Sequence, residues 1–301
     1  TPFRINHPLR VAERIAVLDH LSGGRAEVGL ARSGGAEWAT FEIEGDDTLV
    51  ELDFSQLSQM GSSERGLFLH PVIFAKTKPL ALMDIRSADN KDRWIVAINL
   101  QTQSIQELEH QHDSAWIGGP GISSWNMETG TLGWLKDAAV IYFQSEQSGF
   151  SHLYSMDIST KSKMALTSGS YEVHEVQLSK DSTAFYLSTN MLHPGTRNYY
   201  KLDLKTFQLK PLLSEQGAFE VQLSPDEKQL AYRFSTSTQP WELFTCSVKL
   251  LKAPIQLTHS TTEAFRAYNW QKPEVLSFKA SDGVSVFARL YEPKSAVKNG
   301  A

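Results

Sequence analysis

His110-Gln111-His112-Asp113 is a local cluster whose residue types suit a metal ion. Histidines at positions i and i+2 of a strand project to one face, where they could hold Zn²⁺ or Cu²⁺ with help from Asp113. The flanking Glu107-Leu108-Glu109 and Asp113-Ser114 are typical of a solvated loop between strands, and we favour that interpretation. We therefore assign no metal ligand from the sequence.

Two other features could carry chemistry. Cys246 is the only cysteine, so no internal disulfide can form, and the alternation of its neighbours predicts an inert thiol in a strand. Gly34-Gly35 could suggest phosphate binding, but a lone pair of glycines favours a plain loop. We assign no catalytic and no cofactor-binding residue, and expect no cofactor.

An internal repeat organises most of the chain. Asp137, Asp181 and Asp226 recur after 44 and 45 residues, and each lies in a turn between two apolar strands. We interpret these aspartates as turn residues, because Asp side chains accept hydrogen bonds from the backbone two residues on. The aligned segments are Leu132–Phe143, Val176–Leu187 and Val221–Tyr232.

A second set of strands and a closing strand complete each repeat. The second set is 151–157, 198–203 and 241–245, the closing set is 165–167, 211–213 and 256–258, and an earlier copy lies at 81–86 and 93–98. Four strands in about 45 residues are typical of a β-propeller blade, whereas a β-sandwich needs no such period. The sequence predicts a mainly β fold, a partial propeller of about five four-stranded blades, some degenerate, over 48–275.

Residues 1–47 do not share this period. Residues 7–21 have the apolar spacing of an amphipathic helix, 22–25 stop it, and 26–31 resemble a short buried strand. The sequence therefore predicts a short α/β segment ahead of the propeller.

The opening residues resemble the luciferase-like flavin monooxygenase family. The similarity rests on Asn6–Glu13, Leu18–Arg25 and Glu27–Arg32. That family folds as a (β/α)₈ barrel of about 250 residues, and residues 1–47 amount to barely one αβ unit. The resemblance thus implies a fragment, joined to the rest near Asp46 to Val50, without a complete flavin site.

Residues 50–301 resemble the prolyl oligopeptidase family, in its dipeptidyl peptidase IV-like branch. The similarity rests on Ser87–Ile95, Ala115–Gly121, Phe143–Tyr154, Glu172–Ser179 and Pro240–Leu243. It implies a serine peptidase whose propeller screens peptides before they reach a catalytic domain. Residues 276–301 are similar to the first strand of that α/β-hydrolase domain plus a tail.

The sequence departs from that family at the catalytic residues. An α/β-hydrolase nucleophile lies in a Gly-x-Ser-x-Gly elbow, and no such pentapeptide occurs in these 301 residues. Glu172 and Glu175 do not match the glutamate pair that related peptidases use for the substrate amine, and we interpret them as blade-edge residues. We expect the chain alone to be inactive in proteolysis.

The remaining histidines and tryptophans have structural interpretations. His152, His174 and His193 are assigned to three different blades as hydrogen-bonded packing residues. Aromatic residues in the strands should fill the space between blades. That interpretation extends to Trp116, Trp125, Trp134 and Trp241.

Composition limits the classes of partner. The chain is 41% hydrophobic and 21% charged with a net charge of −5, so it is globular and is not expected to bind nucleic acid or a membrane. In an intact protein the partner would be a peptide substrate; a homo-oligomer and the cellular compartment stay open. Two other functions stay open as well: a stand-alone propeller binding module and a fragment of a flavin-dependent monooxygenase.

Overall fold

The computed structural model describes residues 52–61, 65–123, 129–251 and 253–293. The chain divides between Glu51 and Leu52 into two units, and the described residues belong to the second. The predicted αβ segment, the Gly34-Gly35 loop and Trp125 therefore lie outside the described residues.

The first sheet contains five antiparallel strands. They are β1 (Leu67–Leu69), β2 (Ile73–Phe74), β3 (Leu80–Ser87), β4 (Asp92–Asn99) and β5 (Ser104–His112). The order is β1-β3-β4-β5, with β2 also paired to β3. Strands β3 and β4 are buried along nearly their whole length, so this sheet is covered on both faces.

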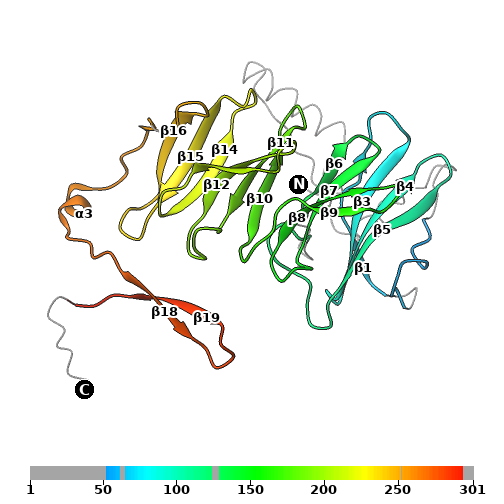
Figure 1. Ribbon diagram of the computed structural model, residues 1–301, viewed down its shortest axis with the longest axis horizontal. Coiled ribbons are helices and arrows are strands. Elements are labelled where there is room, and N and C mark those ends of the chain that lie inside the picture. Colours follow the sequence, from blue (N-terminus) through cyan, green and yellow to red (C-terminus); the bar gives the residue numbers. More distant parts are fainter. Residues whose placement is uncertain (1–51, 62–64, 124–128, 252, 294–301) are drawn as a thin grey trace, which may run out of the picture. The chain divides into compact units, whose positions relative to one another are not determined.

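Three four-stranded antiparallel sheets follow, each built from four consecutive strands (Figure 1). The second sheet contains β6 (Leu132–Lys136), β7 (Val140–Ser145), β8 (His152–Asp157) and β9 (Lys163–Ala165). The third contains β10 (Val173–Leu178), β11 (Ala184–Thr189), β12 (Asn198–Asp203) and β13 (Leu209–Leu213). The fourth contains β14 (Ala218–Leu223), β15 (Gln229–Ser235), β16 (Glu242–Ser247) and β17 (Ile255–Gln256). These four-stranded units confirm the predicted blades of a partial propeller.

The aspartate turns explain where the first hairpin of each repeat bends. Asp181 Oδ1 accepts hydrogen bonds from the Thr183 amide at 3.1 Å and the Ser179 hydroxyl at 2.7 Å, and Asp226 does the same in its own turn. The next residue in each repeat has a left-handed backbone, with φ of 55° at Ser182 and 57° at Glu227. The turn interpretation is confirmed for these two aspartates.

Asp137 has a different role. Its carboxylate accepts hydrogen bonds from the amides of Lys76 and Thr77, at 2.8 and 2.9 Å, about 60 residues earlier in the chain. Glu227 makes a similar contact, since its Oε1 accepts from the Lys180 amide at 2.7 Å. The own-turn interpretation of Asp137 is therefore wrong: an acidic side chain in one hairpin turn binds the backbone of the preceding sheet.

The hydrophobic core lies between successive sheets. Leu82 and Ile95 of the first sheet share a cluster with Ile141 and Phe143 of the second. A second cluster joins the second and third sheets, and another joins the third and fourth. Aromatic residues contribute to each of these clusters, as the sequence predicts. Face-to-face packing of this kind buries apolar surface that a single four-stranded sheet would expose.

A buried ion pair adds a polar link between the first two sheets. Arg93 Nη2 lies 2.7 Å from Asp84 Oδ2, and both side chains are almost fully buried, at 0% and 4% exposed. Arg93 Nη1 also donates to the backbone carbonyl of Gln144 in β7, at 2.7 Å. Ser123 Oγ donates to the second oxygen of Asp84 at 3.0 Å. The two charges are thus paired and further hydrogen-bonded, as burial requires.

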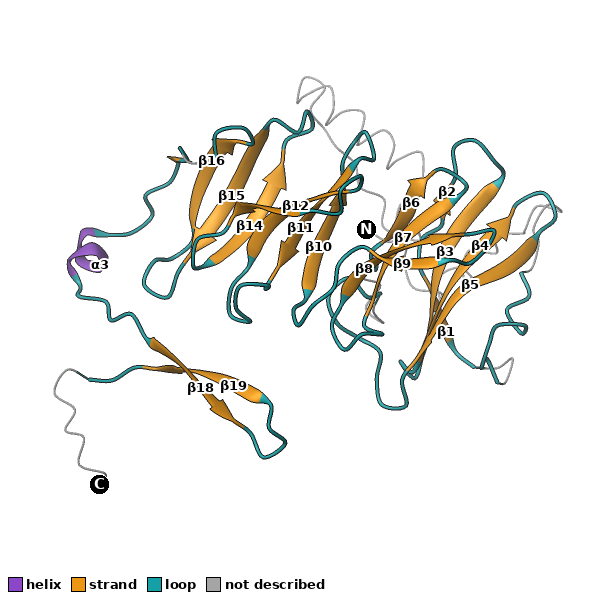
Figure 2. Ribbon diagram, in the orientation of Figure 1, coloured by secondary structure: helices purple, strands orange, loops and turns teal. Residues whose placement is uncertain are grey.

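The end of the described chain lies outside the four sheets. Helix α3 (Glu263–Ala267) is the one helix in the described residues and is capped by Thr262 (Figure 2). Strands β18 (Glu274–Lys279) and β19 (Ser285–Leu290) then form an antiparallel hairpin. None of the helices within the described ranges has the length and apolar character needed to cross a membrane.

Replacing an arginine by leucine should cost more stability at the buried Arg93–Asp84 pair than at an exposed ion pair. Arg93→Leu leaves Asp84 as a buried charge without its partner and should lower the free energy of unfolding by about 3–5 kcal/mol. Arg233→Leu removes the exposed pair with Glu220, whose side chains are 57% and 48% exposed, and should cost less than about 1 kcal/mol. Urea denaturation of both variants measures this difference; equal losses would contradict the assigned role of Arg93.

Candidate functional site

The histidine cluster lies on paired strands. Strand β5 extends through His112, so the prediction of a solvated loop is wrong for Glu107–Glu109 and for the two histidines, whereas Asp113 and Ser114 lie outside any strand, as predicted. His110 Nε2 lies 2.7 Å and His112 Nδ1 2.8 Å from the same oxygen, Oδ1 of Asp92. Asp92 begins β4 and pairs directly with His112 in the strand register.

The sequence suggests Asp113 as an additional metal ligand, but the structure gives its carboxylate a different role. Its Oδ1 accepts hydrogen bonds from the amides of Ala115 and Trp116, at 2.7 and 3.0 Å. The carboxylate that contacts both imidazoles is Asp92, which sequence reasoning missed. A register for the β4–β5 hairpin would have identified it, because residues opposite each other in a pair lie about 4.5–5.5 Å apart.

Asp92 is held as a buried anion. Its side chain is 2% exposed, against 14% for His110 and 41% for His112. Arg65 Nη2 binds Oδ2 of Asp92 at 2.5 Å and is itself held by Asp89. Burial acts to raise the pKa of Asp92, but the hydrogen bonds from His110, Arg65 and His112 outweigh burial and lower it. The indole of Trp94 stacks on His110, with centroids 5.5 Å apart, and fixes that ring.

A cavity of about 420 Å³ adjoins the cluster. His110 and His112 line it, together with Glu109, Glu146 and Lys163. Lys163 Nζ binds Glu109 Oε1 at 2.7 Å. Burial raises the pKa of Glu146, and the negative charge of Glu172 acts in the same direction. The cavity thus contains both signs of charge, next to imidazoles that can donate or accept hydrogen bonds.

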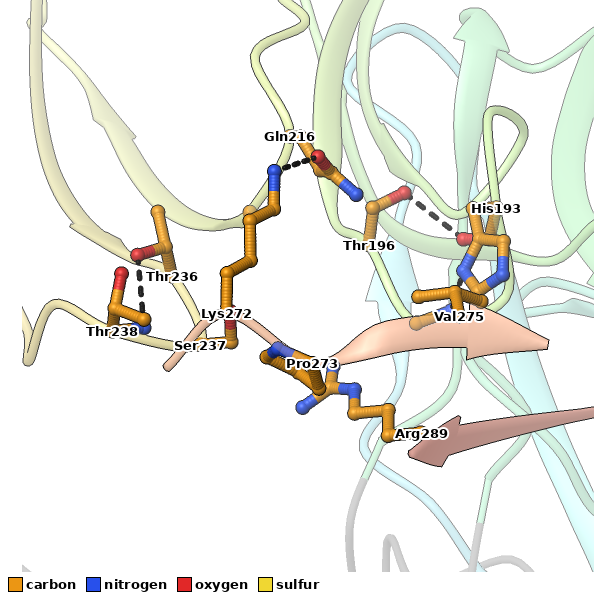
Figure 3. Close-up of a pocket in the computed structure, with 12 residues that line it drawn as sticks. His193, Thr196, Gln216, Thr236, Ser237, Thr238, Lys272, Pro273, Val275 and Arg289 are labelled. Carbon is orange, nitrogen blue, oxygen red and sulfur yellow. Dashed lines mark hydrogen bonds between the residues drawn. The ribbon is translucent and has the colours of Figure 1, made fainter. Parts of the chain in front are cut away.

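A second, smaller cavity of about 210 Å³ lies between loops of the third and fourth sheets and the β18–β19 hairpin (Figure 3). Lys272 Nζ reaches across it to Gln216 Oε1, at 3.1 Å. Arg289 of β19 and His193 also line it. Its charged residues are cations, so its chemistry suits an anionic group such as a carboxylate.

The sequence interpretation of the three blade histidines is confirmed for the packing role of His152 but not for their distribution over three blades. His152 is a hydrogen-bonded packing residue, as predicted, with Thr167 Oγ1 at 3.0 Å and the Gly169 carbonyl at 2.9 Å. His174 lies in β10 and His193 in the loop before β12, so both belong to the third sheet; the assignment to three blades is wrong. The buried Nε2 of His174 has no hydrogen-bond partner.

The tryptophans divide by exposure. Trp134 packs against the cluster between the first and second sheets and donates to the Ile73 carbonyl, as predicted. Trp116 and Trp241 are 57% and 39% exposed, so their assignment to blade packing is wrong. An exposed indole next to the 420 Å³ cavity, as at Trp116, offers a flat surface for a ligand.

The other residues singled out have structural positions. Cys246 is buried in β16, and burial raises the pKa of its thiol, which fits an unreactive strand residue. Glu175 lies on β10, an edge strand of the third sheet, as predicted. Glu172 precedes β10, and its Oε2 accepts a hydrogen bond at 2.6 Å from the amide of Ser151, the residue before β8.

His174 predicts a pH dependence of stability. Burial, aided by the charge of Arg197, lowers the pKa of His174 from 6.5 to about 4, so the folded chain binds its proton less readily than the unfolded chain. The stabilisation is complete above about pH 6.5 and is lost as the pH falls toward 4, by roughly 1–3 kcal/mol. His174→Leu should flatten this slope in urea denaturation at several pH values, whereas His259→Gln, at an exposed position, should retain it. An unchanged slope in His174→Leu would contradict the prediction.

Comparison with known proteins shows two matches along the chain. A family model for luciferase-like monooxygenases matches residues 1–51, and one for the dipeptidyl peptidase IV (DPP IV) N-terminal region matches residues 62–241. Both resemblances found in the sequence are confirmed. The second match extends across the described blades up to the residue before β16.

Solved structures agree on the fold. The crystal structure of Porphyromonas gingivalis dipeptidyl peptidase 4 superimposes with a TM-score of 0.57 at 14% identity, over 74% of this chain and 31% of that one. A Bacteroides ovatus protein, provisionally described as a dipeptidyl aminopeptidase IV, gives 0.58 at 15% identity, over 77% and 34%. This chain thus spans about a third of their length. Since the DPP IV N-terminal region matches more than half of it, the chain belongs to the dipeptidyl peptidase IV N-terminal region family.

Proposed function

We propose that this chain supplies the propeller part of a dipeptidyl peptidase IV-like serine peptidase and screens peptides on their way to a catalytic domain. The observation that carries the proposal is the family match over 62–241, which coincides with the blade-like sheets. Because the chain spans about a third of its solved relatives, the peptidase activity itself is part of the proposal.

The 420 Å³ cavity supports a role in peptide binding. A short peptide carries an ammonium group, a carboxylate and a series of amides. Glu146 offers a carboxylate to the first, while His110, His112 and Lys163 offer donors to the others. The exposed indole of Trp116 suits the ring of a proline or an aromatic side chain.

The β18–β19 hairpin favours this function over a stand-alone binding module. Its exposed large apolar residues are Val275, Leu276, Phe278, Val284, Val286, Phe287, Leu290 and Tyr291. Exposed apolar side chains on both faces of one hairpin are typical of a segment that packs against another part of a protein, and the sequence resemblance assigns the hairpin to the start of a hydrolase domain. The resemblance to a hydrolase strand, which a stand-alone module would lack, is what favours the peptidase propeller.

A flavin-dependent monooxygenase is the weakest alternative. The luciferase-like match is confined to residues 1–51, whereas a (β/α)₈ barrel takes about 250 residues. The purified chain should show no flavin absorbance after incubation with FMN and gel filtration.

The chain by itself should not hydrolyse peptides. Its 301 residues contain no Gly-x-Ser-x-Gly elbow, so they offer no nucleophile of the hydrolase type. A chromogenic Xaa-Pro dipeptide assay should give no turnover above buffer. Turnover that remains with the chain through successive purification steps would contradict this prediction.

Peptide binding should depend on Glu146. Fluorescence anisotropy with a labelled Xaa-Pro tetrapeptide should show saturable binding, and Glu146→Gln should weaken it about tenfold, since a hydrogen bond to a charged group contributes roughly 1.5–3 kcal/mol. Glu263→Gln, on the exposed helix α3, is the matched control and should bind as the unaltered chain does. If no tetrapeptide binds, or if both variants bind equally, the cavity is not the peptide site.

A further inference from the structure

The side chains of Asp92, His110 and His112 offer a set of ligand atoms for a metal ion. One potential ligand atom from each residue lies within 4.8 Å of the other two. Two imidazole nitrogens and one carboxylate oxygen form a donor set that Zn²⁺ uses in proteins. We propose that these three residues form a binding site for a divalent transition-metal ion, with Zn²⁺ as the ion that fits the donors best. This proposal does not depend on the peptidase assignment.

The strand geometry holds the three residues together. His110 and His112 are two apart on β5, and side chains at i and i+2 lie on one face of a strand. Asp92 faces His112 in the β4–β5 register and Arg93 faces Gln111. The ligands therefore stand on paired strands, whose positions are better fixed than those of loop residues.

The present distances require only small movements to admit the ion. The imidazole nitrogens lie 2.7 and 2.8 Å from Asp92 Oδ1, as hydrogen bonds do. Zn²⁺ with bonds of about 2.0–2.1 Å in a tetrahedron separates its ligand atoms by about 3.3 Å. The two nitrogen–oxygen separations must lengthen by roughly half an ångström, and the two imidazole nitrogens, which lie within 4.8 Å of each other, must come to about the same 3.3 Å. Each imidazole then carries its proton on the other ring nitrogen, so two neutral rings and one carboxylate bind the ion.

The surroundings already have the features of an outer ligand shell. The second oxygen of Asp92 accepts from Arg65, which Asp89 holds through both of its oxygens at 2.9 Å. Trp94 stacks on His110 and fixes the plane of that ring. Outer partners of this kind orient metal ligands and tune affinity. The single charge of Arg65 lies between two carboxylates, so the cluster as a whole still favours a cation.

The edge strand that carries the two histidines also borders a cavity. His110 and His112 are among the residues around the cavity of about 420 Å³, and Asp92 is 2% exposed. Glu146 and Asp113 line the same space, so an approaching cation meets negative charge. Three protein ligands leave a fourth position on the ion, which a water can fill.

Metal titration of the full chain tests the proposal. The untagged chain is stripped with EDTA, freed of chelator, and titrated with Zn²⁺ against a chromophoric competitor; Co²⁺ serves as a second probe, since tetrahedral Co²⁺ absorbs in the visible. We expect one saturable site per chain. His112→Gln should weaken binding at least tenfold, because loss of even an outer partner lowers affinity about 10–100-fold.

The controls separate the site from adventitious binding to other histidines, of which the chain has nine in all. His259→Gln should bind as the unaltered chain does, and Asp92→Asn should weaken binding as His112→Gln does. His112 is half-exposed, so that variant should fold, as far-UV circular dichroism will show, even if Asp92→Asn does not. No saturable uptake by the unaltered chain, or equal uptake by His112→Gln, would overturn the proposal.

Discussion

The buried pair of Arg93 and Asp84 is the constraint on which the first half of the fold depends. Two charges withdrawn from water are tolerable only when each finds its partner and further hydrogen bonds. Arg93 meets that condition by reaching into the second sheet, to the Gln144 carbonyl, and Asp84 by accepting from Ser123. Correct packing of the two sheets is therefore a condition for satisfying both charges.

The same ion pair also determines on which face of β4 the candidate metal ligand Asp92 lies. Asp92 and Arg93 are neighbours on β4, and alternation along a strand sends their side chains to opposite faces. Because Arg93 points toward the second sheet, Asp92 must lie on the opposite face of β4. Asp92 then lies opposite His112. A structural requirement in the core thus fixes the arrangement of the polar cluster that borders the larger cavity.

Contacts between sheets give the repeat its cohesion. Apolar clusters join each sheet to the next, and the acidic turn residues Asp137 and Glu227 bind backbone amides of the preceding sheet. This arrangement fits the proposed role of the propeller in screening peptides. The cores provide rigidity, which leaves the residues of loops and strand ends, such as Glu146 and Trp116, to meet a ligand.

The sequence by itself determined the blade period, the strands of the three aligned repeats and the family, because these depend on local alternation, turn chemistry and residue order. It missed β5, which it interpreted as a loop. It did not reveal that Asp92 joins His110 and His112, or that Asp137 binds Lys76. It also placed Trp116 and Trp241 inside when they are exposed. Only the tertiary structure decided these points, because they depend on strand register and on packing between sheets, which bring together residues about 20 to 60 positions apart.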